Sequence, residues 1–217
     1  MIYAETISEA WLSSLHLFAD GAQLNRYESD RGPCVEREDV LISVRRPSTE
    51  PIVADAYPKV FRPLIDGVVS AFVDDPSVRQ SSLRQRLYAW PRRSGKDGGL
   101  SAEPLNQIEL ARKMISESPN SRFIMAGFWD PEIDPFLPNP VAPLHASFRV
   151  RDGLLRSTLM VRTVDAWMGA FPMFVGFAAL HRSLAESTGR GIGGVSFFVL
   201  SYHVYELDLP MVTELLL

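Results

Sequence analysis

A turn signal, Asp152-Gly153, constrains the fold of this chain more than any other sequence feature. An Asp-Gly pair supplies the two positive-φ residues that a tight hairpin turn needs. The pair lies between two runs with β character inside residues 140–169, and this spacing predicts two antiparallel strands joined by a short turn. Arg162 and Asp165 follow at the end of the second run. We therefore expect the hairpin to carry part of a binding site.

Further elements on both sides of the hairpin predict an α+β domain. A capping-box pattern from Thr6 to Glu9 starts the first amphipathic helix, and Pro63 stands at an accepted position for the start of the second. The predicted helices span residues 7–18, 63–74, 105–117 and 172–187, and the other predicted strands span residues 39–44, 122–128 and 195–205. This order indicates one domain over residues 1–217, with a central and mostly non-sequential sheet.

The connecting segments are predicted to be loops. Residues 26–38 are polar, residues 130–143 are rich in proline, and residues 189–194 form a glycine-rich turn. Residues 77–104 combine arginines with glycines, which favours a solvated loop, with an anion-facing flap as the alternative. In the last strand the period of two predicts one shared face for alternate residues, which are Val195, Phe197, Val199, Ser201, His203 and Tyr205.

Composition excludes several classes of protein. The net charge is -4, so there is no general basic surface and no global case for nucleic-acid binding. The one cysteine, Cys34, rules out a disulfide within the chain and fits a reducing cytoplasm. No apolar run is long enough to span a bilayer, and the N-terminus lacks the basic region of a signal peptide. We expect a cytoplasmic enzyme or binding protein without a membrane partner.

Short motifs along the chain resemble those of thymidylate synthase and its nucleotide hydroxymethylase relatives. They occur in the family's order, most of them between Leu105 and Leu207. The matching pieces are Asp30-Arg31, Arg86-Leu87, Asn106-Gln107, Pro119-Asn-Ser-Arg122, Ala142-Pro-Leu-His145, Val161-Arg-Thr-Val-Asp165 with Gly169, and Ser201-Tyr-His-Val-Tyr205. Each piece is weak alone, and their shared order makes the set fairly specific.

The resemblance implies a fold, a partner and a cofactor. The fold would be an α/β sandwich with a central mixed sheet flanked by helices, and two sheets would pack back to back in a homodimer. The activity would be transfer of a one-carbon unit from 5,10-methylenetetrahydrofolate to a nucleotide, with no metal. In that family a cysteine thiolate adds to the pyrimidine ring and makes a neighbouring carbon nucleophilic.

The resemblance also implies roles for individual residues. Arg162, with Thr163 as a hydroxyl donor, would bind phosphate, joined by Arg31 from its loop and by Arg122 from the partner subunit; a guanidinium suits phosphate because it donates two parallel hydrogen bonds. Asp165 would accept from the pterin ring, beside Gly169. The sugar hydroxyl would face His203 and Tyr205, and the reaction centre would have His145 beside it.

Structural interpretations compete with these roles. Asp165 is also placed to cap a helix, and Gly169 is also an ordinary turn glycine. Arg162 could form an exposed salt bridge at the end of a strand, and a lone histidine such as His145 is more often structural. His203 and Tyr205 could be a half-buried pair bonded within the protein.

The chain departs from the family pattern at the reaction centre. Leu144 occupies the cysteine position, so no thiolate addition can start there. Met173 stands near the family's pyrimidine-reading asparagine, and Phe123 replaces a second arginine. Asp66 is the only candidate near the position of the family's proton-handling glutamate. The family's C-terminal tail, which closes over folate, is expected to be absent.

Three hypotheses follow. The first is a one-carbon transferase that acts, without a cysteine nucleophile, on a small molecule or nucleotide that is itself nucleophilic, in specialised metabolism; Leu144 and Met173 would line its acceptor pocket. The second is a non-catalytic relative that binds nucleotide or folate or serves as a partner subunit. The third is hydrolysis or isomerisation with His145, His203 or Asp66 as general base.

Overall fold

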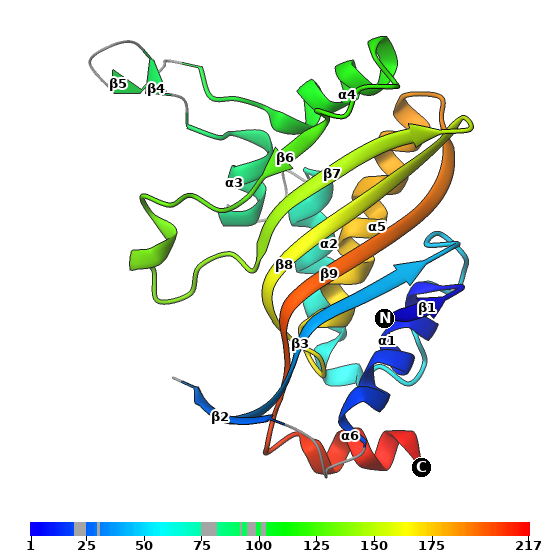
Figure 1. The fold of residues 1–217 in the computed structure, drawn as a ribbon, viewed down its shortest axis with the longest axis vertical. Helices are drawn as coiled ribbons and strands as arrows, with labels where there is room; N and C mark the ends of the chain where they lie inside the picture. Colours follow the sequence, from blue (N-terminus) through cyan, green and yellow to red (C-terminus); the bar gives the residue numbers. More distant parts are fainter. Residues whose placement is uncertain (20–24, 30, 75–81, 92, 95–98, 101–102) are drawn as a thin grey trace.

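The structure is a computed structural model that describes residues 1–19, 25–29, 31–74, 82–91, 93–94, 99–100 and 103–217 (Figure 1). Its helices are α1 (Ile7–Leu15), α2 (Arg62–Val73), α3 (Ser82–Tyr88), α4 (Gln107–Glu117), α5 (Ala170–Ser187) and α6 (Leu209–Leu216), with 3-10 turns at His16–Phe18, Lys59–Phe61 and Asp134–Phe136. Within the described ranges no helix has both the length and the apolar character that crossing a membrane requires.

A seven-stranded mixed sheet forms the centre of the molecule. Its strands are β1 (Ile2–Ala4), β2 (Asn25–Ser29), β3 (Gly32–Val44), β6 (Met125–Gly127), β7 (Pro143–Arg151), β8 (Leu154–Asp165) and β9 (Gly191–Tyr205). The strand order is β1-β3-β9-β8-β7-β6, and β2 pairs with β3. The pairs β1–β3 and β8–β9 are parallel, and the other ladders are antiparallel. The short strands β4 (Arg93–Ser94) and β5 (Gly99–Leu100) pair separately. This mixed sheet with flanking helices confirms the predicted α+β class.

The predicted hairpin is present. Strands β7 and β8 pair antiparallel from Arg151 opposite Leu154 onward. Asp152 and Gly153 have φ angles of 53° and 75°, the left-handed conformation that a two-residue turn of this kind requires. The local sequence decided this turn because only small or Asx residues adopt two consecutive positive φ angles at low cost.

The core lies between the sheet and two long helices. In Figure 1, α5 and α2 run behind the sheet, and no described segment covers the face turned toward the viewer. Phe174 of α5 stacks on Phe197 of β9 with 4.2 Å between ring centroids. Gly176 lets α2 approach, since a Cβ there would lie 2.7 Å from the ring of Phe72. The helix-covered face therefore packs tightly, and the opposite face stays partly exposed.

Two predicted loops are strands, and one is partly a helix. Residues 26–38 hold most of β2 and the first half of β3, because their backbone groups pair with each other and with β9 from Cys34 opposite Tyr205 onward. The predicted turn at residues 189–194 was also wrong, since β9 begins at Gly191. Residues 77–104 include α3, which runs from Ser82 to Tyr88. The residues that would form an anion-facing flap, such as Arg79, Arg92 and Lys96, lie outside the described residues.

The buried face of β8 and β9 switches along the strands, which corrects the prediction of one shared face. In β9, Val195, Phe197 and Val199 are buried, and then Tyr202 and Val204 are buried instead. The neighbouring β3 keeps its register with β9 at this level, but the pairing is interrupted at Asp39, which has a φ of 53° between Glu38 opposite Ser201 and Val40 opposite Val199. The buried face changes on either side of this interruption. Ser201, His203 and Tyr205 consequently turn away from the core.

Candidate functional site

A pocket of about 700 Å³ lies beyond this switch, where β3, β8 and β9 meet the start of α5. Eight of the site residues predicted from the sequence line it, and they come from segments far apart in the chain. These residues are Arg31, Arg162, Thr163, Asp165, Gly169, Met173, His203 and Tyr205. The pocket wall also includes Leu137, Pro138, Asn139 and Pro140 from the proline-rich loop.

Four predicted residues lie outside this pocket. Arg122 is exposed just before β6, and Asp66 is exposed on α2. His145 is half-buried on β7, in register with Met160 and Gly127. Leu144 lies at a break in the β7–β8 register, and its carbonyl accepts hydrogen bonds from the N–H groups of Phe128 and Trp129. Leu144 does not line the pocket, so the prediction that it lines the acceptor pocket is wrong for this pocket.

Arg162 offers a free cation to the pocket. Its guanidinium carbon lies 5.7 Å from the centroid of the Trp129 ring, a cation–π arrangement. Its Nε is buried, and among the described residues it has no hydrogen-bond partner. No carboxylate of the described chain pairs with it either. An anion entering the pocket would therefore find an arginine whose donors are not already used.

Arg31 reaches the same pocket from the β2–β3 turn. Its Nη2 donates a hydrogen bond of 2.9 Å to Oδ1 of Asn139, which stands on the proline-rich wall. The side chain is exposed, so its position depends on this contact. Asn139 was missed by sequence reasoning because nothing local distinguishes it from an ordinary loop asparagine.

Asp165 carries one free acceptor. Its Oδ1 accepts from the backbone N–H of Trp167 at 2.9 Å, within the turn that precedes α5. The predicted helix-capping role is wrong, because α5 begins at Ala170 with Gly169 at its N-cap. Its Oδ2 is buried and has no hydrogen-bond partner among the described residues. Burial raises the pKa of Asp165 to about 6, and the backbone N–H groups of Trp167 and Met168 oppose that rise. A buried acceptor of this kind fits a ligand edge that carries N–H donors, as a pterin ring does.

Gly169 packs closely against the backbone of Asp165. Its N–H donates to the carbonyl of Asp165 at 3.0 Å, and a Cβ at position 169 would lie 3.3 Å from that oxygen and from a methyl of Val164. The glycine therefore permits a close turn onto the strand. The Tyr57 hydroxyl donates to the carbonyl of Met168 at 2.7 Å and holds the same turn.

His203 and Thr163 form a polar pair across the parallel strands. Nδ1 of His203 and Oγ1 of Thr163 are 3.2 Å apart, and Oγ1 of Thr163 also donates to Ser201 at 3.2 Å. Burial lowers the pKa of His203, while the nearby Glu36 carboxylate opposes this effect. A neutral imidazole with one ring nitrogen engaged leaves the other nitrogen for the pocket.

Cys34 and Glu36 of β3 also line the pocket, and sequence reasoning missed both. They alternate on β3 and lie opposite Tyr205 and His203 in the β3–β9 register. Burial, together with Glu36, raises the pKa of the Cys34 thiol. A protonated thiol is a weak nucleophile. If the segment had been recognised as a strand, the alternation of positions 34 and 36 would have placed both side chains on one face of the sheet.

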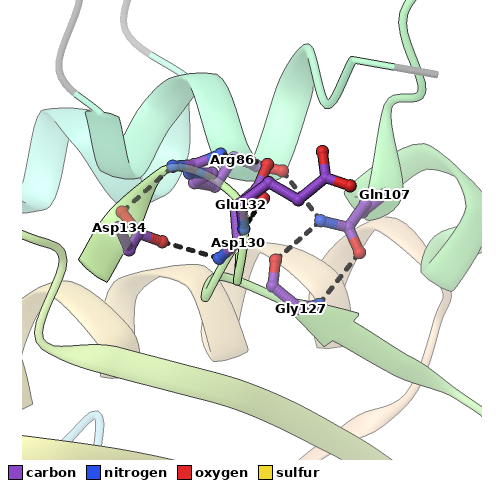
Figure 2. Close-up of polar contacts among 6 residues, drawn as sticks. All are labelled: Arg86, Gln107, Gly127, Asp130, Glu132 and Asp134. Atoms are coloured by element: carbon purple, nitrogen blue, oxygen red, sulfur yellow. Dashed lines mark hydrogen bonds and ion pairs between the residues drawn. The ribbon is translucent and has the colours of Figure 1, made fainter. Parts of the chain in front are cut away.

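A buried ionic cluster around Arg86 lies next to the turn that precedes the wall residues in the chain; Figure 2 shows its polar contacts. Arg86, 6% exposed, contacts Asp130 at 3.1 Å and Asp134 at 3.0 Å. Gln107 donates to the carbonyls of Arg86 and Gly127 and accepts from the N–H of Gly127. The prediction that Arg86 lies in a solvated loop is wrong, because Arg86 belongs to α3 and its side chain contacts the two aspartates. The 130–136 turn leads directly into the wall residues 137–140.

The part of the chain that the structure describes contains no cluster of three or more histidine, cysteine, aspartate or glutamate side chains arranged to hold a metal ion.

Comparisons with known proteins agree with this architecture. A family model described as thymidylate synthase matches residues 78–217. A Methanosarcina acetivorans protein named "Putative thymidylate synthase" is 26% identical over 223 residues, covering 99% of this chain and 94% of that protein. A Methanocaldococcus jannaschii protein of the same name is 24% identical over 176 residues, covering 78% and 75%. The "Thymidylate synthase" of Leuconostoc mesenteroides is 24% identical over 161 residues, covering 73% of this chain and 50% of its own length.

Proposed function

This chain belongs to the thymidylate synthase family, and from that premise we propose that it is a folate-dependent one-carbon transferase that works without a cysteine nucleophile. Its acceptor would be a small molecule or nucleotide that is nucleophilic by itself, in specialised metabolism. The donor would be 5,10-methylenetetrahydrofolate, which supplies a carbon for methyl or hydroxymethyl transfer. The observation that carries the proposal is the free, buried Oδ2 of Asp165 in a pocket that also holds the unpaired Arg162.

The pocket has an acidic group, Asp165, and a basic group formed by Arg162 and Arg31, and each suits a different ligand. Asp165 suits the N–H edge of a pterin, because a buried acceptor without a partner gains most from a donor. Arg162 and Arg31 suit a phosphate or carboxylate on the acceptor. Thr163, His203 and Tyr205 would face hydroxyl groups of that acceptor. A ligand of each kind would satisfy groups that the described protein leaves free.

Two residues support the proposed thiol independence. Leu144 has no nucleophilic atom, and the Cys34 thiol, although it lines the pocket, has a raised pKa. Neither residue therefore supplies a thiolate at neutral pH. An acceptor in this pocket has to bring its own nucleophilic carbon, with Met173 giving an apolar contact.

We also propose a homodimer formed through the exposed face of the sheet, with residues 1–217 as one domain. Support comes from partly buried apolar side chains on that face, such as Leu41, Met160 and Phe198, which alternate with the core residues of their strands. Arg122 would then reach the partner's pocket. The roles predicted for His145 and Asp66 stay predictions, since neither side chain lines the pocket of its own chain.

The direct test is transfer of carbon-14 from labelled methylenetetrahydrofolate to a panel of phosphorylated, electron-rich acceptors. Binding of the donor alone is expected to raise the melting temperature, by about 2.7 kcal/mol of stabilisation at 100 times Kd. Arg162→Ala should weaken acceptor binding at least tenfold. The matched control is Arg156→Ala, an exposed arginine on the same strand outside the pocket, which should leave binding unchanged.

The second candidate is a non-catalytic relative that binds nucleotide or folate. Leu144 and Met173 favour it, because both replace groups that the family uses for chemistry or base recognition. In that case Arg162→Ala changes binding and no labelled product forms under any condition. Leu144→Cys separates the two further: a covalent adduct with a fluorinated uridine nucleotide would show that the pocket still recognises pyrimidines.

A further inference from the structure

Glu36 is a carboxylate inside an otherwise anion-attracting pocket. It lines the pocket with Arg31 and Arg162, and its side chain is half-buried. Among the described residues no hydrogen bond or ion pair engages it. A carboxylate placed there weakens the binding of any anionic ligand by repulsion. Such a group is better explained by something it does to a ligand than by stabilisation of the fold.

The neighbours of Glu36 are suited to proton transfer. His203 lies directly opposite on β9, and Cys34 and Tyr205 form the adjacent pair on the same face. On the other side, β2 places Asn25 opposite Glu36 and contributes Tyr27 to the pocket. His203 is held through Nδ1 by Thr163. Asp165 of β8 is the other carboxylate of the pocket, and one of its oxygens is already occupied by the Trp167 N–H.

We propose that Glu36 is the general base of this pocket, removing a proton from the acceptor so that the acceptor's own carbon becomes nucleophilic. The inference rests on the transferase function proposed above. In the step, an N–H or O–H bond of the acceptor breaks, and its proton forms an O–H bond with Glu36. The electron pair stays on the acceptor and is delocalised onto the attacking carbon.

This assignment names the class of acceptor. It carries an acidic N–H or O–H conjugated with a carbon–carbon double bond, as in enols, phenols and aminopyrimidines, and an anionic group for Arg162. A general base positioned in this way contributes roughly 10²–10⁴ in rate. Of the three bases expected from the sequence, His145 and Asp66 lie outside the pocket, and His203 lines it opposite Glu36.

The test uses 6-aminouridine 5′-monophosphate as probe, without any folate. Exchange of its carbon-5 hydrogen for deuterium in D₂O, followed by NMR, reports how nucleophilic that carbon becomes. We expect the protein to accelerate exchange at least tenfold over buffer. Glu36→Gln should lose at least tenfold of that acceleration, with equal or tighter nucleotide binding.

The matched control is Glu38→Gln. It removes the same charge from the same strand, but Glu38 is exposed and lies outside the pocket, so the rate should stay within twofold of the wild-type rate. If Glu36→Gln fails to fold, Glu36→Asp serves instead, because it keeps the charge and withdraws the carboxylate by one methylene. A tenfold slower exchange with binding retained would then support the proposal.

Two results would overturn it: exchange by the Glu36 variant at the wild-type rate, or no acceleration by the wild-type protein. A thermal shift with methylenetetrahydrofolate distinguishes failure of the role proposed for Glu36 from failure of the transferase proposal. A shift without accelerated exchange refutes the role of Glu36 and leaves the transferase proposal standing. Absence of the shift, together with absence of labelled product, refutes the transferase proposal itself.

Discussion

The guanidinium of Arg86 lies 3.0 Å from a carboxylate oxygen of Asp134, and both side chains are buried. Asp134 also accepts from the N–H of Asp130 at 2.6 Å, so this contact closes the turn that precedes the pocket wall. A buried ion pair adds little stability over an apolar pair, but losing one partner leaves an uncompensated charge. The contribution of this ion pair to stability is therefore best tested by replacing Arg86 alone.

Arg86→Met is expected to lower the free energy of unfolding by about 3–5 kcal/mol, since Asp134 would remain buried without its cation and the partly buried Asp130 would lose the same partner. Urea unfolding measures the change. Arg112→Met is the control: its ion pair with Glu109 lies on the surface of α4, and its loss should cost less than about 1 kcal/mol. Equal losses in the two variants would contradict the role given to Arg86.

His181 should make stability fall in mild acid. It is fully buried, with Nδ1 2.8 Å from the Ser157 hydroxyl and Nε2 3.1 Å from the Gly193 carbonyl, and burial lowers its pKa from 6.5 to about 4. The unfolded chain binds a proton on this residue below pH 6.5 and the folded chain does not. The stability that His181 contributes is therefore lost between pH 6.5 and 4, by roughly 3 kcal/mol.

His181→Gln should remove that part of the pH dependence, although it also lowers stability at neutral pH. Urea unfolding between pH 4 and 7.5 gives the slopes for both proteins. Identical slopes would show that another group titrates in this range.

Asp165→Asn should stabilise the protein at neutral pH while weakening donor binding. The pKa of Asp165 is raised from 3.8 to about 6, so the folded state loses stability as the pH rises through that window. Asparagine removes the cost of the buried charge, and the melting temperature should rise at pH 7.5 but not at pH 3.5. Binding of methylenetetrahydrofolate should weaken at least tenfold.

Asp66→Asn is the matched control for this change, because Asp66 is exposed on α2 and lies outside the pocket. It should alter neither the melting temperature nor donor binding. An effect of Asp66→Asn equal to that of Asp165→Asn would instead support the catalytic role predicted for Asp66 from the sequence.

Gly193→Ala should be severely destabilising. A Cβ at this position would lie 2.3 Å from the carbonyl oxygen of Leu155, at the register shift between β8 and β9, where backbone has to move. We expect a loss of about 3 kcal/mol, the upper end of the usual cost of overpacking. Gly67→Ala in α2 meets nothing within 4 Å and should instead gain about 0.5–1 kcal/mol from helix propensity. Thermal melting compares the two.

Local patterns predicted the hairpin, the amphipathic helices and the order of motifs, because each depends on residues close together in the chain. Asp152-Gly153 determines its own turn, and Thr6 accepts from the N–H of Glu9 as its capping pattern predicts. The same motifs indicated eight residues that the fold brings together in one pocket, although their roles stay predictions. Those eight residues follow from the family resemblance.

Only the tertiary structure decided which faces those strands present. Residues 26–38 carry polar side chains that suit a loop, and they form parts of β2 and β3 because these two strands pair with each other and β9 pairs with β3 from Cys34 onward. That pairing places Glu36 and Cys34 in the pocket, and the irregularity at Asp39 coincides with the level at which His203 and Tyr205 turn away from the core. Arg86 is buried for a similar reason, since its carboxylate partners lie more than 40 positions away. Long-range pairing and charge compensation are properties of the assembled chain, and no window of its sequence contains them.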